Sequence, residues 1–407
     1  MKKIKIKPNI SFITYSTFNF IEKFFAYAAP LVLLKLIGNQ DLYNKIEFIY
    51  SIALIFNIFF DFGIRGYLIY SFRLNKNVKN YTEKVLKFLN LLLLLYLFIF
   101  IFFFLIKFNI KISITDALII ILIFIRSIYL LIINFYRVYY RIKNIPSNIY
   151  YYTIPVNILV FGLVVYFYFN NIVVNLEYFF LPFFFLILFH YSKIVINSDF
   201  SRNIILFISY IKKSLKYYWP LIIISFVNIF IGNYMKIFSF LNMNENDMTK
   251  IAFYLRYLLI IQLVHASFSS FFLSKNFANN RKFLDKKLLI EYVFLLIFFS
   301  FLAILAMPIL SNLIGLNYIK LDQIFILLNL YTFSWCLAAY LEQFLNKFNQ
   351  NKFILKFNLI ALLIFIIISL LTFYDRIFIM SFAMLISSLV YLFLVINHLN
   401  KIGVKVK

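Results

Sequence analysis

Polar and charged side chains lie inside the long apolar stretches of this 407-residue chain. The first stretch carries Tyr15, Ser16, Asn19, Glu22 and Lys23, which fall within about 100° of arc if each residue turns a helix by about 100°. A polar side chain in a membrane-spanning helix is costly, so it usually faces the bundle interior or a water-filled cavity. This spacing predicts a helix with one wet face that runs from its cytoplasmic end to about mid-membrane.

Cations that lie deep in other apolar stretches predict a site for an anion. Arg126 has no carboxylate three or four residues away, so it needs an anionic partner from another helix or an anionic substrate. Lys236 and Arg256 are weaker candidates, because long basic side chains can also reach the membrane interface. Asn228 adds a polar group to the stretch that holds Lys236. Lys23 and Arg126 are therefore the strongest candidates for binding an anion.

Three titratable residues are candidates for ion coupling: Asp61, Glu22 and His265. Asp61 precedes Arg65 by four residues, so the two can form a neutral structural pair along one helix. His265 is more typical of a hydrogen-bonded interior residue than of a proton carrier. Glu342 lies close to an expected helix end, where we expect it to be solvated.

The chain lacks the patterns of metal, phosphate-loop or nucleophile sites. No Gly-rich phosphate loop, zinc pattern or nucleophile elbow occurs. The acidic stretch 244–247 lacks the Gly and the terminal Glu of a calcium loop. The one cysteine, Cys336, lies in an apolar run and is expected to be inert packing. We therefore expect no catalytic residue, no metal and no cofactor.

The apolar stretches that carry these residues must be membrane helices. A chain that is 64% hydrophobic, with 7 Gly and 7 Pro, has too few polar residues to cover a water-soluble globule. Crossing the hydrocarbon takes about 20 residues, and barrel strands would alternate instead of running apolar for that length. The first run continues to Leu36, which favours a span over a cleaved signal. About twelve helices are predicted: 11–37, 47–71, 86–107, 115–137, 147–169, 172–195, 217–240, 250–274, 287–313, 321–346, 353–373 and 375–399.

The basic residues predict how these helices are oriented. Of the 40 Lys and Arg residues, 28 fall in every second gap between the apolar runs. Short cytoplasmic loops collect basic residues, so both termini are expected in the cytoplasm. The formal charge of +25 accompanies an excess of Phe, Ile, Lys, Asn and Tyr that is typical of an AT-rich genome. We therefore expect a multi-pass membrane protein and no nucleic-acid partner.

The segment 196–216 predicts how the chain is divided. It carries an amphipathic pattern of apolar residues, mainly isoleucines, against basic residues, which is typical of a short interfacial helix on the cytoplasmic side. It would join an N-terminal half, 1–200, to a C-terminal half, 201–407, each with six spans in the same orientation. The segments 41–48 and 247–253 are similar and begin the second span of each half. The expected fold is an all-α integral membrane protein with two parallel six-helix bundles around a central cavity.

Three short motifs resemble those of a known transporter family: Leu36-Ile37-Gly38, Leu42-Tyr43 and Phe60-Asp61-Phe62-Gly63-Ile64. With twelve spans and a basic central segment, the chain resembles the polysaccharide flippases, including the Wzx-type O-antigen translocases. These belong to the multidrug/oligosaccharidyl-lipid/polysaccharide exporter superfamily, with the multidrug and toxin extruders and the lipid II flippases. The chain departs from the pattern at Asp41-Leu42-Tyr43, where the usual Gly before Tyr is absent. Lipid II flippases generally have two more spans.

The resemblance implies a transporter and not an enzyme. It would carry an undecaprenyl-diphosphate-linked oligosaccharide, an O-antigen or other surface glycan unit, from the cytoplasmic to the outer leaflet of the bacterial inner membrane. The two bundles would rock alternately around a central site. Besides the lipid bilayer, a glycan polymerase complex is an expected partner. The residues expected to contact the diphosphate are Lys23 and Arg126, with Lys236 and Arg256 less certain, and those for sugar hydroxyls are Tyr15, Ser16, Asn19 and Asn228.

Three other functions remain open on the sequence. A cation-coupled multidrug extruder would favour acidic residues in its cavity, whereas the deep charges here are mostly basic. A membrane-embedded polysaccharide polymerase or ligase would be expected to carry a large external loop, and none longer than about a dozen residues is present. A scaffold for a glycan assembly complex that transports nothing is the third alternative.

Overall fold

The computed structural model describes residues 8–61, 113–142, 146–172, 174–195, 200–278, 283–348, 350–371 and 375–406. Within these ranges the protein is helical apart from one short turn of 3-10 helix and a parallel pair of two-residue strands. The all-α prediction is therefore confirmed.

The elements before residue 243 are α1 (Pro8–Ile37), α2 (Gln40–Phe60), α5 (Ile114–Ile142), the 3-10 turn η1 (Pro146–Ile149), α6 (Tyr150–Phe169), α7 (Leu176–Val195) and α8 (Phe200–Asn242). Those after it are α9 (Glu245–Tyr257), α10 (Leu259–Ala278), β1 (Phe283–Leu284), α11 (Lys286–Ile314), α12 (Gln323–Lys347), α13 (Asn351–Ser369), α14 (Arg376–Lys401) and β2 (Lys405–Val406).

Most of these helices are membrane spans. Ten stretches among the described residues are long and apolar enough to cross a bilayer, with mean hydropathies between 1.2 and 2.8. A shorter apolar helix, Leu176–His190, adds to them. The expected span 86–107 lies outside the described residues. The protein is thus a multi-pass membrane protein, as predicted.

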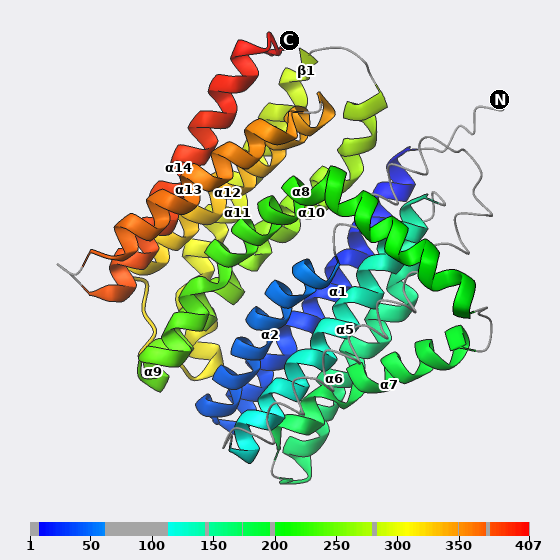
Figure 1. Cartoon of the computed structure of the whole chain (residues 1–407). Helices are drawn as coiled ribbons and strands as arrows, with labels where there is room; N and C mark the ends of the chain where they lie inside the picture. Colours follow the sequence, from blue (N-terminus) through cyan, green and yellow to red (C-terminus); the bar gives the residue numbers. More distant parts are fainter. Residues whose placement is uncertain are drawn as a thin grey trace. The chain divides into compact units, whose positions relative to one another are not determined.

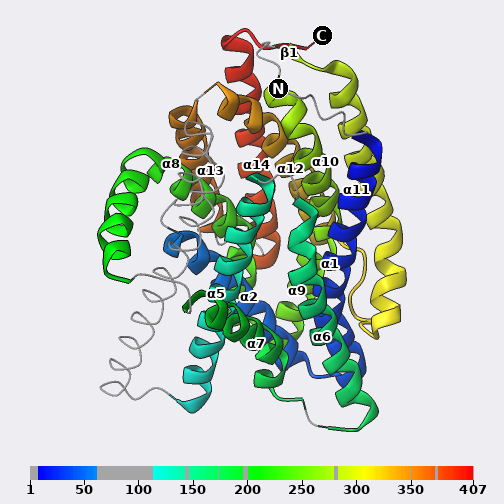
Figure 2. The same cartoon turned by 90° about the vertical axis from the view of Figure 1, so that its right-hand side faces the viewer.

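The helices form two compact units. The C-terminal unit holds Met1–Phe20 and Val227–Lys407, and the N-terminal unit holds Ile21–Phe226. In the C-terminal unit, α12, α13 and α14 lie side by side, and α10 packs on α11 and α12 (Figure 1). In the N-terminal unit, α5 packs between α2 and α7, and α6 packs on α7 (Figure 2). The sequence-based halves, 1–200 and 201–407 in parallel orientation, stay a prediction.

Two predicted spans begin earlier in the structure than hydropathy indicates. Helix α2 starts at Gln40, seven residues before the expected 47, and α9 starts at Glu245, five residues before the expected 250. The side chain of Asn39 accepts a hydrogen bond from the Leu42 backbone N–H at 2.9 Å, and that of Asn244 accepts one from the Asp247 N–H at 2.8 Å. Both caps lie outside the apolar run, so a hydropathy pattern misses the polar first turn.

The prediction that a separate short helix occupies 196–216 is wrong, whereas the interfacial position of this basic segment stays a prediction. Helix α8 instead runs without interruption over 43 residues, from Phe200 to Asn242. At about 1.5 Å per residue it is about 65 Å long, roughly twice the hydrocarbon thickness. Its apolar part is Trp219–Asn242, so the basic first half extends beyond the span. No Gly or Pro occurs between 200 and 219, and Pro220 lies inside the helix at the start of its apolar part.

The expected span 250–274 is divided into two helices. A turn at Leu258 separates α9 from α10, and the Leu258 N–H still donates to the Tyr254 carbonyl at 3.0 Å. The division follows directly after Arg256, which is 4% exposed. Discontinuous membrane helices are typical of transporter binding sites.

Candidate functional site in the N-terminal unit and a polar network in the C-terminal unit

Glu22 is the centre of a charged group that joins three helices of the N-terminal unit. Its carboxylate Oε1 lies 3.0 Å from Arg137 Nη2 on α5 and 3.5 Å from Lys23 Nζ on α1. The side-chain amide of Asn157 on α6 donates to the Glu22 backbone carbonyl at 3.4 Å. Glu22 is buried, whereas Lys23 and Arg137 are about a quarter and a third exposed. One carboxylate thus faces two cations, which leaves a positive charge of one.

Arg126 is held by aromatic rings. Its guanidinium carbon lies 4.3 Å from the ring centre of Tyr50, 4.9 Å from that of Tyr129 and 4.3 Å from that of Phe183. No carboxylate of the described residues pairs with it, so of the two expected alternatives, an anionic partner from another helix or an anionic substrate, the first is not found in that part of the chain. Cation–π contacts of this kind are worth about 0.5–2 kcal/mol each and leave N–H groups available. Its Nη1 atom is buried and has no hydrogen-bond partner among the described residues.

Glu22, Lys23, Arg126 and Arg137 together form what we call the cationic strip. Arg126 is close enough to Lys23 for the two charges to repel each other. The strip holds three cations and one carboxylate within α1 and α5, so its net charge is positive by two. In the low dielectric of a membrane protein, such an excess attracts an anion much more strongly than it would in water.

Arg137 is the strip residue that the sequence analysis missed. The expected span 115–137 ends at this residue, which would place its side chain at the edge of the membrane. Helix α5 instead continues to Ile142. Arg137 follows Arg126 by eleven residues, about three helical turns, so the two lie on the same helix face. That spacing is the signal that identifies it.

The residues of the expected polar face of α1 differ in their surroundings. Asn19 is 7% exposed, and its amide donates to the Ser267 hydroxyl of α10 at 3.0 Å, within the C-terminal unit. The Ser16 hydroxyl is buried and has no hydrogen-bond partner among the described residues. Tyr15 is partly exposed. Asn19 thus ties two helices together, and the sugar-binding role of all three residues stays a prediction.

Lys236 on α8 and Arg256 on α9 are 7% and 4% exposed within the C-terminal unit. Protein atoms therefore surround both side chains, which favours an interior position over the interfacial alternative. Their contact with a substrate stays a prediction.

The three ion-coupling candidates differ in their surroundings. Glu22 is paired with two cations, as described above. His265 shares a hydrogen bond of 2.6 Å with the Tyr292 hydroxyl, which in turn donates to the Cys336 carbonyl at 2.9 Å. Asp61 is buried directly after α2, but its expected partner Arg65 lies outside the described residues. His265 thus has the hydrogen-bonded interior position that the sequence favoured.

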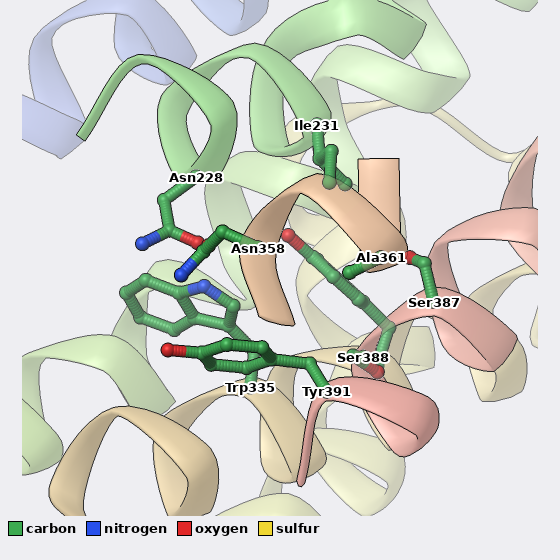
Figure 3. A pocket seen from close by; sticks show the side chains of 9 residues that line it. Asn228, Ile231, Trp335, Asn358, Ala361, Ser387, Ser388 and Tyr391 are labelled. Atoms are coloured by element: carbon green, nitrogen blue, oxygen red, sulfur yellow. The ribbon is translucent and has the colours of Figure 1, made fainter. Parts of the chain in front are cut away.

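A small pocket lies among α8, α12, α13 and α14 of the C-terminal unit. Its volume is about 20 Å³. Figure 3 shows the amides of Asn228 and Asn358 turned toward the same space as the rings of Trp335 and Tyr391. The pocket is thus lined mainly by polar and aromatic groups from four helices.

Glu342 lies beside this pocket. Its Oε2 accepts a hydrogen bond from the Tyr391 hydroxyl at 2.6 Å, and its Oε1 accepts one from the Asn346 amide at 3.3 Å. The expectation that Glu342 is solvated is therefore wrong for its carboxylate. Helix α14 packs along α12 and brings Tyr391 onto it, a contact that the sequence of α12 alone does not reveal.

Comparisons with known proteins give one informative similarity. No family model matches the chain, and no curated protein matches it. Among solved structures, the chain is similar to "Lipid II flippase MurJ, inward closed conformation", with a TM-score of 0.62 and 14% sequence identity. The similarity covers 95% of this chain and 87% of that chain. At this identity the match establishes the fold: the chain folds like a multi-helix membrane flippase over nearly its whole length.

Proposed function

We propose that the protein is a flippase that moves an undecaprenyl-diphosphate-linked oligosaccharide from the cytoplasmic to the outer leaflet of the bacterial inner membrane. Within this class, the oligosaccharide would be an O-antigen unit or another surface glycan unit. The observation that carries the proposal is the cationic strip, which places three cations and one carboxylate within membrane helices. The fold shared with a lipid II flippase supports the same class of cargo.

The chemistry of a lipid diphosphate fits the strip. Its anionic head cannot cross hydrocarbon unaided, whereas its polyprenyl tail can stay in lipid. Lys23 Nζ and Arg126 Nη1 offer donors for charge-assisted hydrogen bonds to phosphate oxygens. Glu22 holds Lys23 and Arg137 in fixed positions without cancelling both charges. A site ordered before binding loses less entropy when the diphosphate enters.

The strip argues against the transport of cationic drugs. A drug cation would need a free carboxylate at this site, but within the cationic strip the one carboxylate, Glu22, is already paired with two basic side chains. A lipid-linked anion needs the opposite arrangement, which the N-terminal unit provides. Membrane-embedded polymerases and ligases are disfavoured by the short external loops of the sequence.

Removal of the strip charges tests the proposal. We expect Lys23→Met, Arg126→Met and Arg137→Met each to slow flipping of a fluorescent lipid-linked oligosaccharide in reconstituted vesicles by about tenfold or more, because each charge-assisted contact is worth about 1.5–3 kcal/mol. Lys356→Met is the matched control, since Lys356 is exposed on α13. The amount of monodisperse protein is measured in parallel. Wild-type flipping by the triple variant would end the proposal.

Arg126→Lys separates substrate binding from a structural role. It keeps the charge among the three rings but loses the planar fork that can hold two phosphate oxygens. We expect nearly normal folded protein and flipping reduced to an intermediate rate. If Arg126→Lys and Arg126→Met both lower the yield of folded protein while the rate per molecule stays normal, Arg126 is a packing residue only.

A further inference from the structure

Glu342 is a carboxylate in a membrane span that has no cationic partner among the described residues. Its hydrogen-bond partners are two neutral groups, the Tyr391 hydroxyl at 2.6 Å and the Asn346 amide at 3.3 Å. Ion pairs within the described part of the chain include those of Glu22, Asp41 and Asp322, and none of these pairs includes Glu342. An ionised carboxylate without a cation is costly at membrane depth, and binding a proton removes that cost.

Tyr391 connects this carboxylate to the small pocket. Its hydroxyl donates to Glu342, and its side chain lines the pocket. Asn358, Tyr391 and Asn228 line the pocket, as Figure 3 shows. A volume of about 20 Å³ is enough for one water molecule, and Tyr391, whose hydroxyl donates to Glu342, lines this pocket.

Apart from Tyr391, the titratable groups considered below, on helices that pack on α12, have partners other than Glu342. From α14, Tyr391 faces it, and His398 on the same helix instead stacks on Phe353 at 4.2 Å. From α10 and α11, His265 and Tyr292 bond to each other and to the Cys336 carbonyl. From α13, the amide of Asn358 donates to the Ile354 carbonyl of its own helix at 3.0 Å. No charged side chain of the described residues pairs with Glu342.

We propose that Glu342 is the proton-binding group that couples ion movement to the transport cycle. The proposal rests on the flippase function proposed above. Protonation forms one O–H bond on the carboxylate, consumes one proton and breaks no covalent bond. It turns the charge-assisted hydrogen bond from Tyr391 into a weaker neutral one. Because that bond joins α12 to α14, proton binding changes the contact between two neighbouring helices of the C-terminal unit.

The first test needs no substrate. Of the two tryptophans, Trp335 lines the pocket with Tyr391, so a Trp219→Phe background leaves one local reporter. Because the His265 ring centre lies 6.0 Å from that of Trp335, the titration uses a His265→Gln background, in which we expect the emission of Trp335 in detergent or nanodiscs to change with pH in one transition. Glu342→Gln should abolish the transition, whereas Glu291→Gln, an exposed residue of α11, should keep it. Tyr391→Phe retains the carboxylate and should move the midpoint.

Two outcomes of this titration would overturn the proposal. One is a transition that persists unchanged in both Glu342→Gln and Tyr391→Phe. The other is emission that follows the sodium concentration at fixed pH instead of following pH, which would assign the pocket to a metal cation. If Glu342→Gln does not fold, Tyr391→Phe decides alone, because an unshifted midpoint then counts against the proposed site.

A second test separates this proposal from the flippase function. In vesicles with a pH gradient, we expect the wild-type flipping rate to depend on the gradient and the rate of Glu342→Gln to be independent of it. A gradient-dependent Glu342→Gln variant contradicts the coupling role. A wild-type protein that flips nothing contradicts the flippase function, while the Trp335 titration still reports whether Glu342 binds a proton.

Discussion

Three charged side chains inside the bundle are stabilised by three different kinds of partner. Glu22 has two cations, Arg126 has three aromatic rings, and Glu342 has neutral hydroxyl and amide donors. A buried carboxylate paired with cations keeps its charge and a guanidinium does not lose its proton, whereas a carboxylate with only neutral partners can bind a proton. The kind of partner therefore indicates a role: a fixed positive strip in one unit and a titratable carboxylate in the other.

At the residue scale, we predict that Glu22→Gln destabilises the protein. The substitution leaves Lys23 and Arg137 without their carboxylate, and loss of one partner from a buried pair costs about 3–5 kcal/mol, less where the cations are partly exposed. Thermal unfolding in detergent measures the effect. Glu177→Gln, an exposed residue at the start of α7, is the control and should be neutral.

A double variant sharpens this prediction. Lys23→Met in the Glu22→Gln background removes one of the orphaned cations and should recover part of the lost stability, because the effects of paired residues are not additive. Equal stability of wild type and Glu22→Gln would show that the carboxylate does not hold the strip together.

At the element scale, helices α2 and α9 begin with the same kind of N-cap. Asn39 caps α2 and Asn244 caps α9, and each is followed by an aspartate in the first turn, Asp41 or Asp247. The two segments were matched on sequence, and the structure adds the same cap hydrogen bond to both. The similarity of 41–48 and 247–253 thus extends to the local backbone.

We predict that Asn39→Ala and Asn244→Ala each cost about 1 kcal/mol, since each leaves a backbone N–H of the first turn without its acceptor. Asn242→Ala is the matched control, because this exposed amide lies at the end of α8 and caps no helix start. Unfolding in detergent compares the three variants. If Asn242→Ala costs as much as the two cap variants, the caps have no special role.

At the scale of the whole molecule, the alternation of basic and non-basic gaps is a prediction about orientation. A cytoplasmic reporter enzyme should be active when fused after Lys79, Arg141 or Arg281 and inactive after Asn171 or Asn246, because short cytoplasmic loops collect basic residues. A reporter active only outside the cytoplasm serves as the complementary control. Activity of one reporter at both groups of sites would refute the twelve-span arrangement.

The sequence alone determined that this protein lies in a lipid bilayer, and it determined most of the membrane spans. Runs of about twenty apolar residues have one low-cost structure in lipid, a helix, because every backbone N–H must be satisfied within the segment. The expected ends of the spans 287–313 and 375–399 lie within about two residues of α11 and α14. The hydropathy pattern misplaced the start of a helix where polar residues belong to it, namely at the capped start of α2 and in the basic first half of α8.

For the polar groups within the helices, too, the sequence determined one part and the tertiary structure determined the other. Lys23 and Arg126 were identified from the sequence because a cation within an apolar run can be recognised without knowledge of the fold. Only the tertiary structure placed Arg126 among three rings and joined Glu22 to Arg137, 115 residues later in the chain. It alone brought Tyr391 onto Glu342, 49 residues earlier. Periodicity fixes the face on which a side chain lies, whereas its partner depends on which helix packs there, and that choice is made by long-range packing.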